Sequence, residues 1–208
     1  KKFAGYKQKD GQKLYDVLLD DYEEGFTMEI LDDFFGKLRD ALVPVVHAVS
    51  EKSDYISIDC LRKTYDVEVQ KKLSHFIAEY IGFDFNRGVM AETEHPYTTN
   101  LHNHDVRITN HYQENKLEDA IFSVIHEGGH GLYEMGISDE ITLSPIGGGT
   151  SMGMHESQSR FYENNLGRSY EFWVPLYDKV KEYFPVELDG VTLDDFYKKY
   201  DDVKTVGK

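Results

Sequence analysis

The pair of histidines at positions 126 and 130 constrains this chain more than any other feature of its sequence. In a helix, residues four apart lie on one face, one turn from each other, so both imidazoles can bind the same metal ion. Imidazole nitrogens bind Zn²⁺ at about 2.0–2.1 Å. Glu127 would then lie beside the ion, where its carboxylate can accept a proton from a water molecule. The spacing therefore predicts a metal centre with a neighbouring base.

The residues around this pair favour a helix. Apolar side chains recur at helical spacing on both sides of it, at Leu117, Ala120, Ile121, Val124, Ile125 and Leu132. Gly136 is a suitable stop. Gly128, Gly129 and Gly131 oppose a helix, since each costs about 1 kcal/mol relative to alanine. Such a run predicts that something approaches this backbone closely. The alternative is an ordinary core helix with two hydrogen-bonded histidines.

A third metal ligand has to come from elsewhere in the chain. Catalytic zinc sites keep three protein ligands, and structural sites have four. Cys60 is the only cysteine, which excludes a thiolate site, and Gly136 stands where an extended motif would place a third histidine. The remaining option is an acidic residue of the next predicted helix, residues 152–165, which the glycine-rich loop 144–151 allows to fold back. Glu156 is the predicted third ligand.

Other acidic residues could orient these imidazoles by accepting their second N–H. Glu118, Asp119 and Glu134 lie on the predicted motif helix, and the sequence does not choose among them. Glu163 lies seven residues beyond the third ligand, on the same helical face. It is a further candidate for this supporting role.

Four motifs, in this order along the chain, resemble the Taq-type (thermostable carboxypeptidase 1) family of metallocarboxypeptidases. They are His95-Pro96-Tyr97, Asp105-Val106-Arg107-Ile108-Thr109, His126-Glu127-Gly128-Gly129-His130 and His155-Glu156-Ser157-Gln158-Ser159-Arg160. Chains of that family are far longer, with sequence before residue 1 and after residue 208, and this chain has no initiator Met. We therefore expect residues 1–208 to form a single partial catalytic domain of a longer helical peptidase.

The resemblance implies a zincin-type helical fold and the release of C-terminal amino acids from peptides with a free C-terminus. It implies Zn²⁺ or Co²⁺ as the metal, and a homodimer as the common assembly. On this interpretation the metal ligands are His126, His130 and Glu156, and Glu127 is the general base.

Residues 104–112 alternate between apolar and polar side chains, which predicts a half-buried strand with Val106 and Ile108 on one face. The polar face carries Asp105, Arg107 and Thr109. As a substrate-binding strand, it would present the forked N–H donors of Arg107 to a terminal carboxylate. Asp105 would hold the guanidinium, and Thr109 would add a hydroxyl. The alternative is a surface strand whose exposed ion pair contributes under about 1 kcal/mol.

His95 either faces the cleft and binds substrate or is one more loop histidine. Elsewhere the chain is predicted to be mainly helical, with a small antiparallel sheet region beside the motif helix. Helices are expected over 12–24, 28–49, 67–81, 167–183 and 193–200, with a polar loop over 50–65. We expect the first two helices to contribute to the wall and the core of the fold and to have no direct function.

Composition narrows the class of protein. The chain has 38 acidic and 23 basic residues, and its formal charge of −15 argues against nucleic acid as a partner. No apolar run approaches the roughly 20 residues of a membrane span, so we expect no membrane partner. A single cysteine fits a reducing compartment, and the cytoplasm is the expected location.

Two other functions stay open. The Glu156-Ser157-Gln158 and Glu163-Asn164 pattern is also similar to thimet-type oligopeptidases, which would make the chain an endo-acting peptidase. The motif around Arg107 favours a carboxypeptidase, because those oligopeptidases need no carboxylate anchor there. The third possibility is an inactive metal-binding fragment, since walls of the cleft normally come from sequence absent here.

Overall fold

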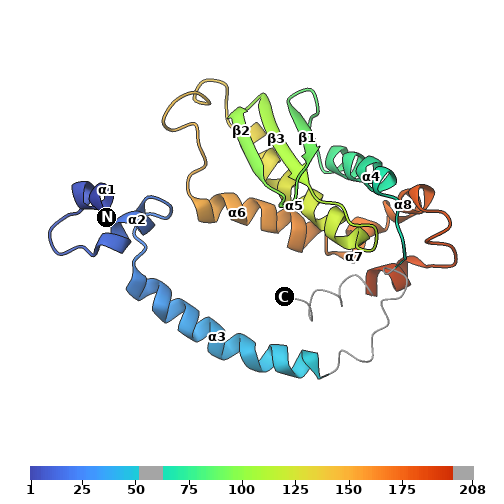
Figure 1. The fold of residues 1–208 in the computed structure, drawn as a ribbon, viewed down its shortest axis with the longest axis horizontal. Helices are drawn as coiled ribbons and strands as arrows, with labels where there is room; N and C mark the ends of the chain where they lie inside the picture. Colours follow the sequence, from blue (N-terminus) through green and yellow to red (C-terminus); the bar gives the residue numbers. More distant parts are fainter. Residues whose placement is uncertain (52–62, 199–208) are drawn as a thin grey trace.

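A computed structural model describes residues 1–51 and 63–198 of the chain, and it is mainly helical (Figure 1). Its helices are α1 (Lys2–Lys7), α2 (Leu14–Asp20), α3 (Met28–Ser50), α4 (Val67–Tyr80), α5 (Leu117–Met135), α6 (Met152–Arg160), the π-helix η3 (Phe161–Leu166), α7 (Tyr170–Trp173) and α8 (Tyr177–Tyr183). Its strands are β1 (Gly88–Glu92), β2 (Thr98–His102) and β3 (Asp105–Asn110). Among these helices, none is both long and apolar enough to cross a membrane.

The three strands form one small sheet in the order β1-β3-β2. β2 and β3 pair antiparallel, with Thr98 opposite Ile108, whereas β1 pairs parallel with β3. The predicted sheet is therefore present, but it is mixed rather than antiparallel throughout. The short connection between β2 and β3 forces them to run in opposite directions. β1 is separated from β3 by the whole of β2, so it can take the other edge in the parallel sense.

The core lies between this sheet and α5, with α4 alongside (Figure 1). Val106 and Ile108 of β3 are fully buried with Ile121 and Ile125 of α5, as the alternation of β3 predicts. Burying an aliphatic side chain of this size stabilises the fold by about 1.5–3 kcal/mol. This packing fixes α5 against the sheet.

The glycines of α5 permit close contacts on two of its sides. A Cβ added at Gly131 would lie 2.8 Å from the ring of Phe83, and one at Gly129 would lie 2.8 Å from Cα of Ser159 on α6. Neither space admits a side chain without movement of its neighbour. The predicted close approach to this backbone is confirmed, and it explains why α5 tolerates residues of poor helix propensity.

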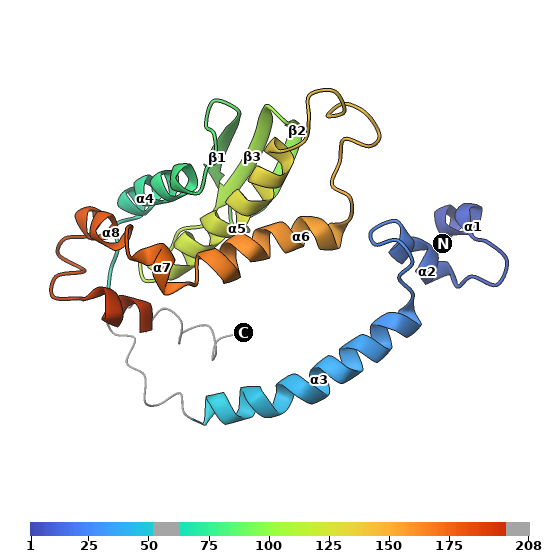
Figure 2. The ribbon, with the colours of Figure 1, turned by 180° about the vertical axis from the view of Figure 1, so that it is seen from behind.

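Helix α3 differs from the rest of the fold. Its N-cap is the predicted Thr27, whose Oγ1 accepts a hydrogen bond from the backbone N–H of Ile30 at 3.3 Å. No residue of α3 is buried, and both views show it standing away from the sheet and α5 (Figure 2). The expectation that this helix belongs to the core is wrong for the described residues, because its apolar side chains are exposed or only partly buried among them.

Two other predicted helices differ in extent from the observed ones. Helix α2 covers only Leu14–Asp20 of the predicted 12–24, and the predicted helix over 167–183 is divided into α7 and α8. Pro175 lies between α7 and α8, where its missing N–H and fixed ring disfavour a continuous helix. Residues 193–198 are helical as predicted, whereas the last two residues of that prediction and most of the predicted polar loop lie outside the described residues.

Candidate metal centre

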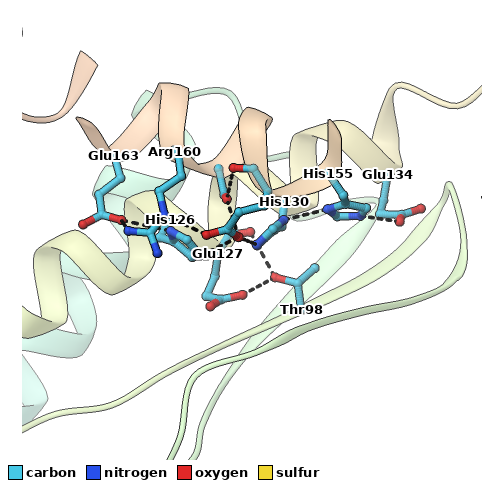
Figure 3. Close-up of polar contacts among 10 residues, drawn as sticks. Thr98, His126, Glu127, His130, Glu134, His155, Arg160 and Glu163 are labelled. Atoms are coloured by element: carbon cyan, nitrogen blue, oxygen red, sulfur yellow. Dashed lines mark hydrogen bonds and ion pairs between the residues drawn. The ribbon is translucent and has the colours of Figure 1, made fainter. Parts of the chain in front are cut away.

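The three predicted metal ligands lie together between α5 and α6 (Figure 3). Glu156 Oε2 lies 3.2 Å from Nε2 of His130 and 3.7 Å from Nε2 of His126. One donor atom from each of the three residues lies within 4.8 Å of the other two. Two imidazoles and a carboxylate at this separation are a donor set that suits Zn²⁺ and similar divalent ions. The structure therefore brings together residues that are up to thirty positions apart.

Local features of α6 place the carboxylate. Ser151 caps the helix by accepting a hydrogen bond from the backbone N–H of Met154 at 3.1 Å, and the N–H of Met152 donates to the carbonyl of Tyr22 at 3.0 Å. The close approach at Gly129 lets α6 lie against the turn of α5 that carries both histidines. Glu156 comes one turn after the start of α6, at that contact.

The predicted base, Glu127, is buried and held by the sheet. Thr98 of β2 donates its hydroxyl proton to Glu127 Oε2 at 2.5 Å and lies 3.1 Å from the carbonyl oxygen of the same residue. Burial raises the pKa of the Glu127 carboxyl above its ordinary value, against the hydrogen bond from Thr98 and the nearby charge of His126. Sequence reasoning missed Thr98, because no local pattern indicates which face of β2 meets α5.

The two histidines predicted to bind metal have different hydrogen-bond partners. Nδ1 of His126 lies 3.0 Å from Glu163 Oε2, as expected for a supporting carboxylate. Nδ1 of His130 lies 2.6 Å from Nδ1 of His155, whose Nε2 lies 2.7 Å from Glu134 Oε1. Glu134 thus reaches the ligand only through a second histidine, which the sequence analysis did not anticipate.

Glu163 lies in η3, the π-helix that continues the predicted second site helix beyond α6. Its carboxylate also accepts hydrogen bonds from Arg160 at 3.1 Å and from Arg168 at 2.8 Å. The wider turn of a π-helix often occurs at functional sites, because it redirects side chains relative to the preceding α-helix. Here it is the element that turns Glu163 toward His126.

The surroundings of His130 and Glu156 favour the protonation states in which these groups bind metal. Burial lowers the pKa of His130 to about 4, assisted by the neighbouring His126 and His155, so its imidazole is neutral near pH 7. Burial opposes ionisation of Glu156, but the hydrogen bond from Arg160 at 2.7 Å and the charge of His126 bring the pKa of this carboxyl below its ordinary value. A neutral imidazole and an ionised carboxylate are the forms that bind metals.

Two cavities of about 690 and 680 Å³ meet at this centre, and Pro96 and Glu127 line both. The larger is lined by His130 and Glu156, together with Tyr22, Tyr97, Thr98 and His155. The other is lined by His126 and the predicted substrate-binding residue His95, together with His111, Arg160 and Arg168. A chain-like substrate therefore has space on both sides of the base.

The other predicted substrate-binding residues do not lie in these cavities. Arg107 donates to both oxygens of Asp105, at 2.8 and 2.9 Å, and its exposed side chain lies on the face of β3 opposite Ile108 and α5. Thr109 is buried and bonded to Thr93 and to the backbone of Tyr97. Among the described residues, Arg107 thus forms the predicted pair with Asp105 but is not brought beside the ligands.

In this mainly helical fold, two histidines and a glutamate on one helix lie beside a second glutamate on the next. This arrangement is typical of zincin-like metallopeptidases. The family described as carboxypeptidase Taq (M32) metallopeptidase matches residues 1–206. This chain belongs to that family.

Curated relatives and solved structures agree with this assignment. The chain is 40% identical to "Carboxypeptidase 1" of Bacillus subtilis over 91% of its length. It is 36% identical to "Thermostable carboxypeptidase 1" of Thermus thermophilus over 89% of its length. It also matches the crystal structure titled "BsuCP" with a TM-score of 0.89, covering 95% of this chain at 39% identity. The M32 carboxypeptidase of Deinococcus radiodurans matches with a TM-score of 0.86, covering 95% of this chain at 37% identity.

The matched regions are parts of longer proteins. The chain spans 38% of the Bacillus relative and 36% of the Thermus relative, and about the same share, 40% and 39%, of the two solved structures.

Proposed function

We propose that this chain carries the catalytic metal centre of a metallocarboxypeptidase that releases C-terminal amino acids from peptides. The observation that carries the proposal is the meeting of His126, His130 and Glu156 beside the buried carboxylate of Glu127. The family match supports the reaction class. The proposed metal is Zn²⁺ or Co²⁺, held by these three ligands.

A metal ion bound there would supply Lewis-acid polarisation of the peptide carbonyl and would lower the pKa of a water molecule. Glu127 would accept the proton of the attacking water. Its Oε2 is engaged by Thr98, which leaves Oε1 to take that proton. Because burial raises its pKa, the carboxyl can hold the proton and then pass it to the leaving amine.

The proposed substrates are peptides with a free C-terminus, and His95 is the proposed contact in the cavity beside His126. The position of Arg107 on the outer face of the sheet does not support its expected role as carboxylate anchor. We propose instead that the Asp105–Arg107 pair is a structural feature of β3. The anchor would then lie outside residues 1–208, in a part that corresponds to the remaining length of the relatives.

The remaining proposals concern the assembly, location and partners of the protein. The family resemblance supports a homodimer, and the single cysteine supports a cytoplasmic location. The charge of −15 continues to argue against nucleic acid as a partner.

Metal binding without turnover is a second candidate, which two observations favour. The chain spans only 38% of the Bacillus relative, and α3 exposes apolar side chains including Phe34, Phe35 and Leu42. Such a surface is normally covered in a complete enzyme.

One experiment separates these functions. The purified chain would be loaded with Zn²⁺, its metal content measured, and its activity tested on a short peptide and on the same peptide with a C-terminal amide. Cleavage of the free peptide alone supports a carboxypeptidase, equal cleavage of both supports an endo-acting oligopeptidase, and bound metal without cleavage supports the inactive metal-binding protein. A chain that binds no Zn²⁺ would contradict the proposed metal centre.

A further inference from the structure

The two predicted ligand histidines lie one turn apart on the same face of α5, but the group that faces Nδ1 differs between them. His126 faces the carboxylate of Glu163 directly, at 3.0 Å. His130 faces another imidazole, that of His155, and the carboxylate of Glu134 lies one residue further away (Figure 3). His155 directly precedes the third ligand, so α6 contributes to the centre twice.

The geometry of this second arrangement fixes where its protons lie. His130 presents Nε2 to the metal position, as its distance of 3.2 Å to Glu156 shows, so its proton is on Nδ1 in the metal-binding form. That N–H donates to Nδ1 of His155, at 2.6 Å. His155 must then carry its own proton on Nε2, which donates to Glu134 at 2.7 Å. His130, His155 and Glu134 therefore form a series of hydrogen bonds in which each histidine donates to the next group, and the last acceptor is the carboxylate of Glu134.

The far end of this series is anchored in the sheet. Glu134 is buried, and its second oxygen accepts a hydrogen bond from Nδ2 of Asn100 at 2.6 Å. Asn100 lies two residues after Thr98 on β2, on the same face, so one strand holds both the base and this carboxylate.

His155, in the middle of this hydrogen-bonded series, also packs against neighbouring residues. The ring of Tyr133 lies 4.8 Å from that of His155, and a Cβ on Gly149 would lie 3.0 Å from the His155 ring and 3.1 Å from Tyr133. A side chain at residue 149 would therefore require one of these rings to shift. Gly149 and Tyr133 thus pack against the His155 ring and limit its movement.

We propose that His155 and Glu134 are positioning residues that hold His130 in its metal-binding orientation and tautomer, with Asn100 fixing Glu134. This inference rests on the proposed metal centre and adds to it residues outside the ligand set. Groups that orient a ligand imidazole typically contribute 10- to 100-fold to metal affinity.

The test measures Zn²⁺ affinity of the purified chain by competition with a chelator. We expect His155→Ala to raise the dissociation constant by about 10- to 100-fold. His155→Asn should recover part of the loss, because its Oδ1 can still accept the proton of His130 Nδ1 while its amide no longer reaches Glu134. Glu134→Ala should fall between the wild type and His155→Ala.

His104→Ala is the matched control. His104 also pairs with a carboxylate, Asp139, at 3.0 Å, but both side chains are exposed and neither lines the two cavities of the centre. This variant should bind Zn²⁺ like the wild type, whereas Glu156→Ala should lose the metal. The absorption spectrum of the Co²⁺-loaded chain provides a second measurement, which should change in His155→Ala and stay unchanged in His104→Ala.

Unchanged Zn²⁺ affinity in His155→Ala would overturn this inference and leave the metal centre standing. If circular dichroism shows that His155→Ala does not fold, His155→Asn and Glu134→Ala provide the test. Wild-type Zn²⁺ affinity in both of these variants would also overturn the inference. A wild-type chain that binds no Zn²⁺ would overturn the proposed centre and this inference together.

Discussion

Helices α3 and α5 have similar apolar patterns, but α5 is largely buried and α3 is exposed. α5 is packed between the sheet, α4 and α6, and most of its apolar side chains are buried. α3 is longer and rich in phenylalanine, leucine and valine, yet none of its residues is buried within the described chain. Apolar periodicity therefore predicts a helix and the face that would be buried, but it does not predict which element covers that face. The predicted metal centre lies on the helix that packs against other described elements.

The largest effect is expected from the base on α5. Glu127→Gln keeps the shape of the side chain and cannot accept a proton, so we expect peptidase activity to fall by about 10²- to 10⁴-fold while Zn²⁺ stays bound. Activity on a free peptide and metal content are the two measurements. The control on α3 is Glu29→Gln, in the exposed first turn, which should leave both unchanged. Activity within tenfold of the wild type at equal metal content would contradict the role of Glu127.

The second effect concerns stability and compares one apolar residue from each helix. Ile125→Ala in α5 removes a completely buried side chain and should lower the free energy of unfolding by about 2–5 kcal/mol. Phe34→Ala in α3 removes a side chain that is 54% exposed and should change it by no more than about 0.5 kcal/mol. Urea denaturation measures both. A large loss in Phe34→Ala would mean that α3 is covered in solution, for example by a second copy of the chain.

A pair of glycines tests the same contrast without removing any contact. A Cβ at Gly129 in α5 would meet the backbone of Ser159 at 2.8 Å, so Gly129→Ala should destabilise the chain by about 1–3 kcal/mol. At Gly36 in α3 nothing lies within 4 Å, and Gly36→Ala should stabilise by about 0.5–1 kcal/mol through helix propensity. The sign of the change in urea midpoint distinguishes the two. Stabilisation by Gly129→Ala would show that α6 does not approach α5 as closely as described, and destabilisation by Gly36→Ala would show that α3 is covered in solution.

The smallest effect is expected at Arg107. Its side chain lies on the outer face of the sheet, in an exposed pair with Asp105 that contributes about 1 kcal/mol or less. Arg107→Ala should therefore alter turnover of the free peptide by about twofold or less and should leave the amidated peptide uncleaved, as in the wild type. A selective loss of about ten- to a hundredfold for the free peptide would restore the carboxylate anchor expected from the sequence.

The parts of the predicted centre that depend on short spacing could be read from the sequence. The four-residue interval of His126 and His130 needs only a helix to bring both imidazoles to one face, and the apolar stripe of α5 secures that helix. Elimination of other donors left Glu156, and α6 does place it beside the histidines. The mainly helical fold and the family followed from the same motifs, which the family match confirms.

The residues that surround the predicted ligands depend on how the helices and strands pack. Thr98 at the base, and His155 between Glu134 and His130, result from which face of β2 meets α5 and how closely α6 lies against α5. The outward position of Arg107 follows from the side of β3 that α5 covers. Such contacts join residues far apart in the chain, and no local periodicity encodes them. The exposure of α3 has the same physical origin, because burial is a property of two surfaces and a sequence pattern describes only one.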